Sequence, residues 1–168
     1  MLRRHQPVQV QHRRRSDGSP SGAGYPLGVL VLDPVHHDAL VAHALRGFPL
    51  EACGLIAGDE VTENGTGTVH WFYPCENAAA SGKLYTVAPR DHLRADRDAE
   101  SNGWQIIGVV HSHTHTDAYP SSTDVAEAPD PAWHYVIVSL RDEDPSVRSY
   151  RIVDGVISEE PVVVPDRE

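Results

Sequence analysis

The sequence has few cysteines and no long apolar run, and both features restrict what the chain can be. Cys53 and Cys75 are the only cysteines among the 168 residues, and their spacing is not that of a Cys-x-x-Cys pair. This argues against a disulfide framework and against a cysteine-based zinc knuckle, so a metal here must be bound by histidine and carboxylate. No apolar run approaches the roughly 18 to 20 residues of a membrane span, and no hydrophobic segment follows the N-terminal arginines as in a secretory signal. We therefore expect a cytoplasmic protein.

Basic residues are scarce outside the N-terminal segment. The first fifteen residues hold five arginines and no acid, so the rest of the chain carries 9 basic against 24 acidic side chains. An acidic body of this kind repels nucleic acid and keeps a protein soluble. The length suits a single domain with its own core. The Ser-, Gly- and Pro-rich stretch after the arginines predicts that residues 1–24 form a disordered basic tail and that residues 25–168 form the domain.

Local signals predict strands mixed with two or three helices. A short strand at 29–32 should lead into a helix from Pro34 to about Arg46, with Asp33 as its N-cap and Gly47 at its end. Four apolar residues at helical spacing predict the buried stripe of this helix: Val35, Ala39, Ala42 and Leu45.

Further along the chain, Asn64-Gly65 predicts a hairpin turn between strands at 53–58 and 69–74. A surface helix is expected from Pro89 until Gly103 stops it, followed by strands at 104–110 and 134–140 and by two short strands around Asp154-Gly155. This order of elements predicts an α/β or α+β domain with a central sheet.

Histidines occupy alternate positions at the end of an apolar run, in "GVVHSHTHTDAYPSSTDV" at 108–125. Side chains two apart in a strand point to the same face, so His111 and His113 can present two imidazoles to one point. Zinc accepts histidine nitrogen and carboxylate oxygen, and a catalytic site uses three protein ligands with water in the fourth position. Asp124, in the first turn of a short helix beyond the loop, is the candidate third ligand.

Each of these residues also has an ordinary interpretation. A His-x-His pair is more often a solvated strand end, an acid at a helix start is favoured by the helix dipole, and Ser121 can be an N-cap. The complete order H-x-H-x7-S-x2-D behind an apolar strand favours the metal site over these separate explanations.

The same order resembles the signature of the JAMM (MPN-plus) metalloprotease family, and the resemblance covers roughly residues 28–160. The matching positions are His111-Ser112-His113, Pro120-Ser121, Asp124, an upstream Glu51 in "FPLEACGLIAG", and Asn77 in "YPCENAA". Many members have proline after the second histidine, whereas this chain has Thr114 followed by His115. We expect a differently shaped loop on the substrate side, with His115 outside the metal ligands and engaged in a substrate or structural hydrogen bond.

The resemblance implies a fold and a set of roles. The fold would be a single MPN-type domain, related to the cytidine-deaminase fold, with a central curved mixed β-sheet flanked by two or three helices. One zinc ion would be held by His111, His113 and Asp124, which lowers the pKa of its water toward about 7. Glu51 would act as general acid and base, and Ser121 would donate a hydrogen bond to the developing oxyanion. Ser112 would point away from the metal.

The resemblance also implies a substrate class, because members of the family cleave peptide or isopeptide bonds after the C-terminal glycine of ubiquitin-like proteins. "HSHTHTDAYPSSTD" and "PLEACGLIAG" are most like the actinobacterial members that release cysteine from a ubiquitin-like sulfur carrier of the CysO type, in cysteine biosynthesis. The expected partner is therefore a Gly-Gly-terminated carrier, with no nucleic acid and no membrane, and a homodimer is left open.

Three other functions compete with this one. The first is a deubiquitinase-like peptidase that processes other glycine-terminated carriers, which would use the same residues. The second is a non-catalytic scaffold, which is disfavoured because such members usually lose a site residue. The third is a zinc nucleoside deaminase, which is rejected because "PCEN" at Pro74 lacks a second cysteine and precedes the histidines. Cys53 could face either the site or the core, and the core is the commoner place for a small thiol.

Overall fold

The computed structural model of the chain describes residues 28–59 and 62–166, so the expected tail at 1–24 lies outside the described residues. Three helices are interspersed among the strands of this part of the chain. The elements, in chain order, are β1 (Leu30–Val31), α1 (Pro34–Gly47), β2 (Cys53–Gly58), β3 (Gly67–Cys75), α2 (Pro89–Ser101), β4 (Gln105–His113), α3 (Ser122–Ala126), β5 (His134–Ser139), β6 (Ser146–Val153), β7 (Val156–Glu160) and β8 (Val162–Val163).

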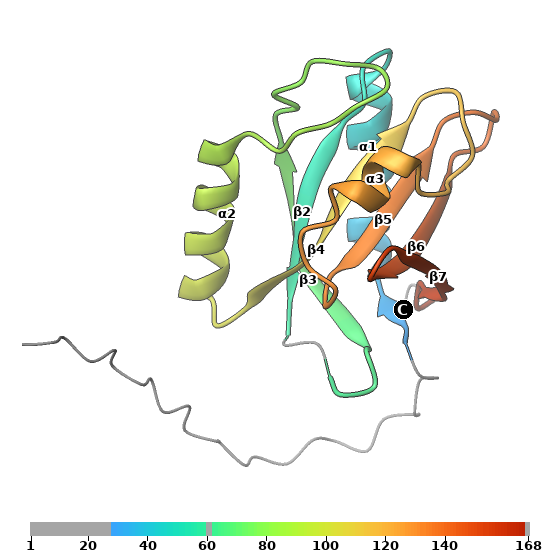
Figure 1. The fold of residues 1–168 in the computed structure, drawn as a ribbon. Coiled ribbons are helices and arrows are strands. Elements are labelled where there is room, and N and C mark those ends of the chain that lie inside the picture. The colour runs from blue at the N-terminus through green and yellow to red at the C-terminus, as the bar shows by residue number, and fades with distance from the viewer. Residues whose placement is uncertain (1–27, 60–61, 167–168) are drawn as a thin grey trace, which may run out of the picture.

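The strands of the described residues form one mixed sheet in the order β7-β6-β5-β4-β2-β3-β1-β8. β2 pairs antiparallel with β3 and β4, whereas β4 pairs parallel with β5. β1 pairs parallel with both β3 and β8. β8, at one edge of the sheet, contacts β6 near the other edge, so the curved sheet nearly closes on itself (Figure 1). The expected α/β fold with a curved mixed sheet is confirmed.

The helices cover the two faces of this sheet, because consecutive strand residues point to opposite sides. One face packs against α2 and α3, through a cluster that includes Leu55, Ala95, Ala99, Val109 and Ile137. The other face packs against α1, through a cluster that includes Leu40, Ala44, Ile56, Val110 and Val136. Within the described ranges, no helix is both long enough and apolar enough to cross a bilayer.

The start of α1 is as predicted, but its buried face is not. Asp33 caps the helix, since its carboxylate accepts a hydrogen bond from the Val35 amide at 2.8 Å. The predicted stripe is wrong at its two ends, because Val35 is 71% exposed and Leu45 is 55% exposed, whereas Ala39 packs against the core. Leu40 and Ala44 are the buried residues of the helix. His43 adds a polar contact to the sheet, since its Nε2 donates to the carbonyl of Cys53 at 2.9 Å.

The predicted turns are confirmed. Gly65 and Gly103 have φ values of 77° and 75°, and Asp154-Gly155 connects β6 to β7 with φ values of 50° and 77°. Such left-handed conformations favour glycine. The strand predicted at 104–110 instead continues to His113, because its pairing with β5 extends as far as the Ser139 partner of that histidine. Both histidines therefore lie within regular strand.

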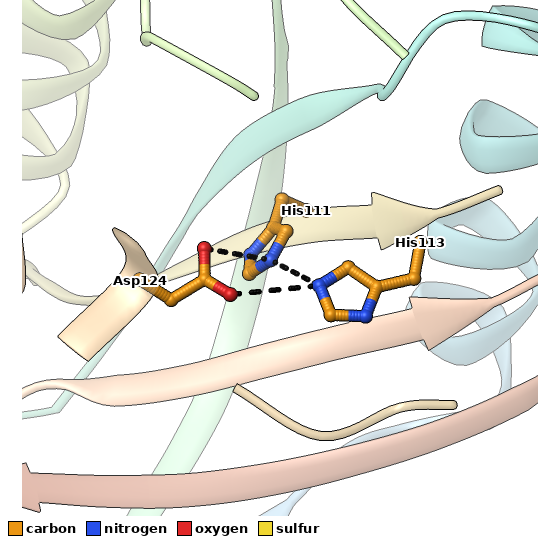
Figure 2. Close-up of side chains that lie close together, drawn as sticks. All are labelled: His111, His113 and Asp124. Carbon is orange, nitrogen blue, oxygen red and sulfur yellow. Dashed lines mark hydrogen bonds and ion pairs between the residues drawn. The ribbon is translucent and has the colours of Figure 1, made fainter. Parts of the chain in front are cut away.

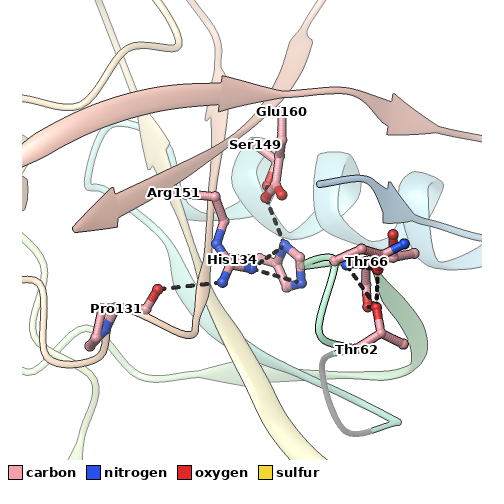
Figure 3. A network of polar contacts seen from close by, with 8 residues as sticks. Thr62, Thr66, Pro131, His134, Ser149, Arg151 and Glu160 are labelled. Carbon is pink, nitrogen blue, oxygen red and sulfur yellow. Dashed lines mark hydrogen bonds and ion pairs between the residues drawn. The ribbon is translucent and has the colours of Figure 1, made fainter. Parts of the chain in front are cut away.

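A buried polar cluster lies where the sheet closes (Figure 3). The Glu160 carboxylate, at the end of β7, accepts hydrogen bonds from His134 Nδ1 on β5 at 2.6 Å and from Ser149 Oγ on β6 at 2.7 Å. Arg151 places its guanidinium 3.4 Å from Nε2 of the same histidine. Gly67 on β3 lies against the ring, and a Cβ there would come within 2.3 Å of Nε2. The cluster therefore ties four strands together, and its close packing requires a residue without a side chain on β3.

Candidate metal centre

His111, His113 and Asp124 converge on one point at the end of β4 (Figure 2). The two imidazoles project from the same face of the strand, and their Nε2 atoms lie 3.1 Å apart. The loop after β4 brings Asp124, at the start of α3, against both rings. Its Oδ1 lies 3.3 Å from His111 Nε2 and its Oδ2 lies 3.5 Å from His113 Nε2. The three residues proposed as ligands are therefore brought together.

The surroundings of Asp124 and His111 favour the protonation states that bind a cation. Burial alone would raise the pKa of Asp124, but hydrogen bonds from His111 and His113 hold that pKa well below its usual range, so the carboxylate is ionised. Burial lowers the pKa of His111 despite the adjacent carboxylate, which favours its neutral form. Burial opposes protonation of His113, but hydrogen bonds with Asp124 and with the Asp117 carbonyl raise its pKa overall. Metal ligands must be deprotonated, so Asp124 and His111 already have the required form and His113 would release a proton to a metal.

The two histidines are oriented in different ways. His113 Nδ1 donates to the backbone carbonyl of Asp117 at 2.7 Å, which directs its Nε2 toward Asp124 and reserves that nitrogen for a metal. His111 Nδ1 is buried and has no hydrogen-bond partner among the described residues. Its ring is instead stacked on Tyr85, with centroids 4.3 Å apart and planes 18° apart. Packing therefore fixes the first ring and a hydrogen bond fixes the second.

The donor set fits zinc. Two imidazole nitrogens and one carboxylate oxygen lie within 4.8 Å of one another, and this nitrogen and oxygen chemistry matches a catalytic zinc site with three protein ligands. His115 is not part of this group; it is exposed, and its ring lies edge-on to Phe48 with centroids 5.8 Å apart. Its predicted position outside the ligand set is consistent with this arrangement.

Glu51 lies just before β2 and borders the same site. It is 7% exposed, and with His113, Ser121 and Asp124 it lines a pocket of about 260 Å³. Burial raises the pKa of Glu51 to about 7, against the opposing effect of His113. A carboxyl group with a pKa near neutral can both accept and return a proton at the pH of the cell.

The backbone around Glu51 is anchored on both sides. Ser112, which alternates with the two histidines on β4, accepts a hydrogen bond from the Ala52 amide at 2.8 Å, and its own amide donates to the Ala52 carbonyl at 2.9 Å. Ser112 therefore points away from the histidines, as expected. The Glu51 amide donates to the carbonyl of Ser81 at 2.8 Å.

Asn77 connects Glu51 to the loop between β3 and α2. Its Nδ2 donates to the carbonyls of Glu51 and Leu84, both at 2.9 Å. Its Oδ1 accepts from the amides of Ala79 and Thr86, both at 3.0 Å. One amide side chain thus holds the whole loop against the residue proposed as the base.

We expect Asn77→Ala to lower the free energy of unfolding by about 2 kcal/mol, because the modest hydrogen bonds of this side chain are lost and their partners are partly solvated. Activity should fall at least tenfold, because the loop beside Glu51 loses its anchor. Urea unfolding and turnover assays measure the two effects. Asn102→Ala, which removes an exposed amide contact at the end of α2, is the control. Normal activity in Asn77→Ala would contradict a positioning role.

Ser121 has two contacts with Asp124. Its hydroxyl accepts a hydrogen bond from the Asp124 amide at 3.2 Å, and its amide donates to Asp124 Oδ2 at 2.6 Å, which makes a capping box at the start of α3. A hydroxyl has one donor and two acceptor sites. The cap uses an acceptor site and leaves the O–H free, so the N-cap interpretation and a role in the pocket are compatible.

Cys53 belongs to the core rather than to the site. It is buried in the apolar cluster that also holds Cys75, and its Sγ lies 3.5 Å from the carbonyl of Glu76. Burial raises the pKa of the Cys53 thiol to about 12, so it stays protonated and unreactive.

Two contacts of the site were missed by the sequence interpretation. Tyr85 stacks on His111, and the carbonyl of Asp117 orients His113. No local pattern links Tyr85 to a histidine 26 positions later in the sequence. A backbone carbonyl has no sequence signal of its own.

Comparisons with known proteins agree with this geometry. The family described as prokaryotic homologs of the JAB domain matches residues 33–153. The chain is 44% identical over 137 residues to a CysO-cysteine peptidase from Mycobacterium tuberculosis, covering 81% of this chain and 91% of that protein. It is 34% identical over 107 residues to a desampylase from Haloferax volcanii, covering 61% of this chain and 74% of that protein. The solution structure of a protein from Desulfitobacterium hafniense matches with a TM-score of 0.75 and 32% identity, over 82% of this chain and 94% of that one.

Proposed function

The chain belongs to the family of prokaryotic homologs of the JAB domain, and on that basis we propose that it is a zinc metallopeptidase that releases cysteine from a ubiquitin-like sulfur-carrier protein. The observation that carries this proposal is the convergence of two histidines and an aspartate beside a buried glutamate. The named relatives support the coarser conclusion that the chain is a hydrolase acting on peptide bonds.

His111, His113 and Asp124 would hold one zinc ion per chain. Zinc in that position would supply Lewis-acid activation of water and of the scissile carbonyl. The remaining chemistry falls to the side chains that line the pocket.

Glu51 is the proposed general base and acid. Its carboxylate takes a proton from water, whose oxygen adds to the carbonyl carbon of the terminal glycine. The bond from that carbon to the cysteine nitrogen then breaks, and Glu51 returns the proton to the leaving nitrogen. The products are a carrier that ends in a glycine carboxylate and a free cysteine. Proton transfer by a group placed in this way contributes about 10² to 10⁴-fold to the rate.

Ser121 is the proposed oxyanion donor. Its hydroxyl lines the pocket beside Glu51 and Asp124, and the capping interaction leaves its O–H group free. A single donor to a developing oxyanion typically contributes about 10² to 10³-fold. The capping box fixes the serine at the pocket wall, so the same interaction that starts α3 also preorganises this donor.

The cysteine adduct of the carrier is the preferred substrate because the relative named as a CysO-cysteine peptidase is similar over most of both chains. The similarity to a desampylase favours a second candidate, a peptidase of other glycine-terminated carriers. A non-catalytic scaffold is disfavoured, because every residue proposed for catalysis is present and lies in or beside one pocket.

The test is intact-mass analysis of a ubiquitin-like carrier ending in Gly-Gly-Cys after incubation with the zinc-loaded protein. We expect the mass to fall by one cysteine residue with the wild type and to stay constant with Glu51→Gln. An unchanged mass for the cysteine adduct, together with cleavage of other glycine-terminated conjugates, would overturn the choice of substrate and support the second candidate.

A further inference from the structure

The pocket beside Glu51 contains a single lysine and no arginine. Its walls come from three segments of the chain, and the lining residues are Glu51, Gly82, Lys83, His113, Thr114, His115, Thr116, Ser121 and Asp124. Lys83 is also the only lysine in the whole sequence, in a chain that carries an excess of acids. The one lysine of the sequence therefore lines the pocket where chemistry is proposed.

The side chain of Lys83 is available for binding. It is exposed, and it forms no ion pair with any of the residues that the structure describes. Its one recorded hydrogen bond comes from its backbone amide, which donates to Ser81 Oγ at 3.1 Å. The ammonium group is thus not used to stabilise the fold.

The backbone of Lys83, by contrast, is held in place. Thr114 Oγ1, from the loop after β4, donates to the carbonyl of Gly82 at 3.3 Å. Asn77 binds the carbonyl of Leu84, and Glu51 binds the carbonyl of Ser81. The residues on both sides of Lys83 are therefore tied to the segments that carry the proposed ligands and the proposed base. The ammonium group is therefore unpaired while its backbone is fixed beside the pocket, which leaves it available to a ligand there.

The chemistry of the leaving group indicates what this cation would bind. When the leaving group is a single C-terminal amino acid, its α-carboxylate is one carbon away from the nitrogen of the scissile bond. When the leaving group is the side-chain amine of a protein lysine, no carboxylate lies at that distance. The two charges of a bound zinc ion are already balanced by Asp124 and an ionised Glu51, so a further carboxylate in this pocket needs another cation as its partner. A charge-assisted hydrogen bond from lysine provides that partner.

We propose that Lys83 binds the α-carboxylate of the departing amino acid, so that the pocket selects a single C-terminal residue over a protein-linked amine. This inference rests on the proposed function and adds to it the residue that determines the kind of leaving group. Lys83 is thus a specificity-determining residue. The bond that breaks is still the one between the glycine carbonyl carbon and the nitrogen of the departing amino acid.

The test compares two substrates that differ only at the C-terminus. One is a ubiquitin-like carrier ending in Gly-Gly-Cys with a free carboxylate, and the other is the same carrier with a C-terminal carboxamide. We expect the wild type to cleave the acid with a kcat/KM about tenfold higher than the amide, as for the loss of one charged hydrogen bond. Lys83→Met should bring this ratio close to one, by slowing cleavage of the acid alone. Lys83→Arg should retain most of the preference.

Arg97→Met is the matched control, since it removes an exposed cation from α2 in a different hollow of the surface. It should leave the ratio at the wild-type value.

A loss of activity in Lys83→Met that is equal for both substrates would indicate a merely structural role for Lys83 and would overturn the inference. Equal cleavage of both substrates by the wild type would overturn it as well, while the proposed function would stand. Cleavage of neither substrate by the zinc-loaded wild type would contradict the proposed function, and the inference would fall with it.

Discussion

Asp124→Ala is expected to lose both zinc and hydrolytic activity. Asp124 provides the one carboxylate oxygen of the candidate ligand group, and it contacts both histidines. Without it, two neutral imidazoles are left to bind a divalent cation. The measurement is the zinc content after equilibration with one equivalent of zinc and dialysis, together with turnover on the Gly-Gly-Cys carrier. We expect less than a tenth of the wild-type zinc and no detectable turnover.

Asp124 also accepts the hydrogen bond from the Ser121 amide, so its loss is expected to destabilise the start of α3 by about 1 kcal/mol. Asp124→Asn separates the two effects, because it keeps a capping acceptor and loses the charge. Its metal-free form should melt above that of Asp124→Ala, though below the wild type because the interactions of the charge with the two histidines are lost, and it should still bind zinc poorly. Asp117→Ala removes an exposed acid from the same loop but leaves the carbonyl that orients His113, and it should retain the metal. Stoichiometric zinc in Asp124→Ala would refute the ligand assignment.

Glu51→Gln is expected to bind zinc normally and to lose at least 10²-fold in kcat. Glutamine has the size of glutamate but cannot take up a proton, so only the acid and base function is removed. Burial raises the pKa of Glu51 to about 7, which means that above pH 7 the folded, metal-free protein must hold an ionised carboxylate in a poorly solvated place. Glutamine avoids this cost, so the metal-free variant should be at least as stable as the metal-free wild type at pH 8, and no different below pH 4.

Zinc analysis, single-turnover kinetics and thermal melting of the metal-free proteins distinguish these effects. Glu127→Gln serves as the control, because it makes the same change at an exposed acid in a different hollow, on the side of Tyr85. It should leave turnover unchanged. Wild-type turnover in Glu51→Gln would show that another group is the base.

The elements that were predicted correctly are those with a local cause. Asp33 before Pro34 starts α1, and Gly65 and Gly103 take the positive φ angles that their turns require. The buried face of α1 was predicted only in part, since helical spacing alone did not separate the buried Leu40 and Ala44 from the exposed Val35 and Leu45. The parallel pairing of β1 with β8 was not predicted either, because it joins segments from opposite ends of the described chain.

The residues of the candidate site also fall into those that the local sequence predicts and those that it does not. His111, His113 and Asp124 lie within one short stretch of sequence, and strand alternation followed by a short helix is enough to bring them together. Glu51 is far away in sequence, and it reaches the site because β2 pairs with β4, with Cys53 opposite His111. The family resemblance indicated Glu51, whereas spacing could not. The stacking of Tyr85 depends on a loop held by Asn77, and only the three-dimensional arrangement reveals it.

The near-closure of the sheet has a consequence for self-association. Strands at the edge of a sheet expose unpaired backbone groups, and long, flat edges invite a second chain to add as a further strand. Among the described residues the two edge strands are β7, with five residues, and β8, with two. β8 also lies against β6, and β7 carries the exposed Glu159. The curvature that brings β8 back against β6 therefore leaves little exposed strand backbone on which aggregates could grow.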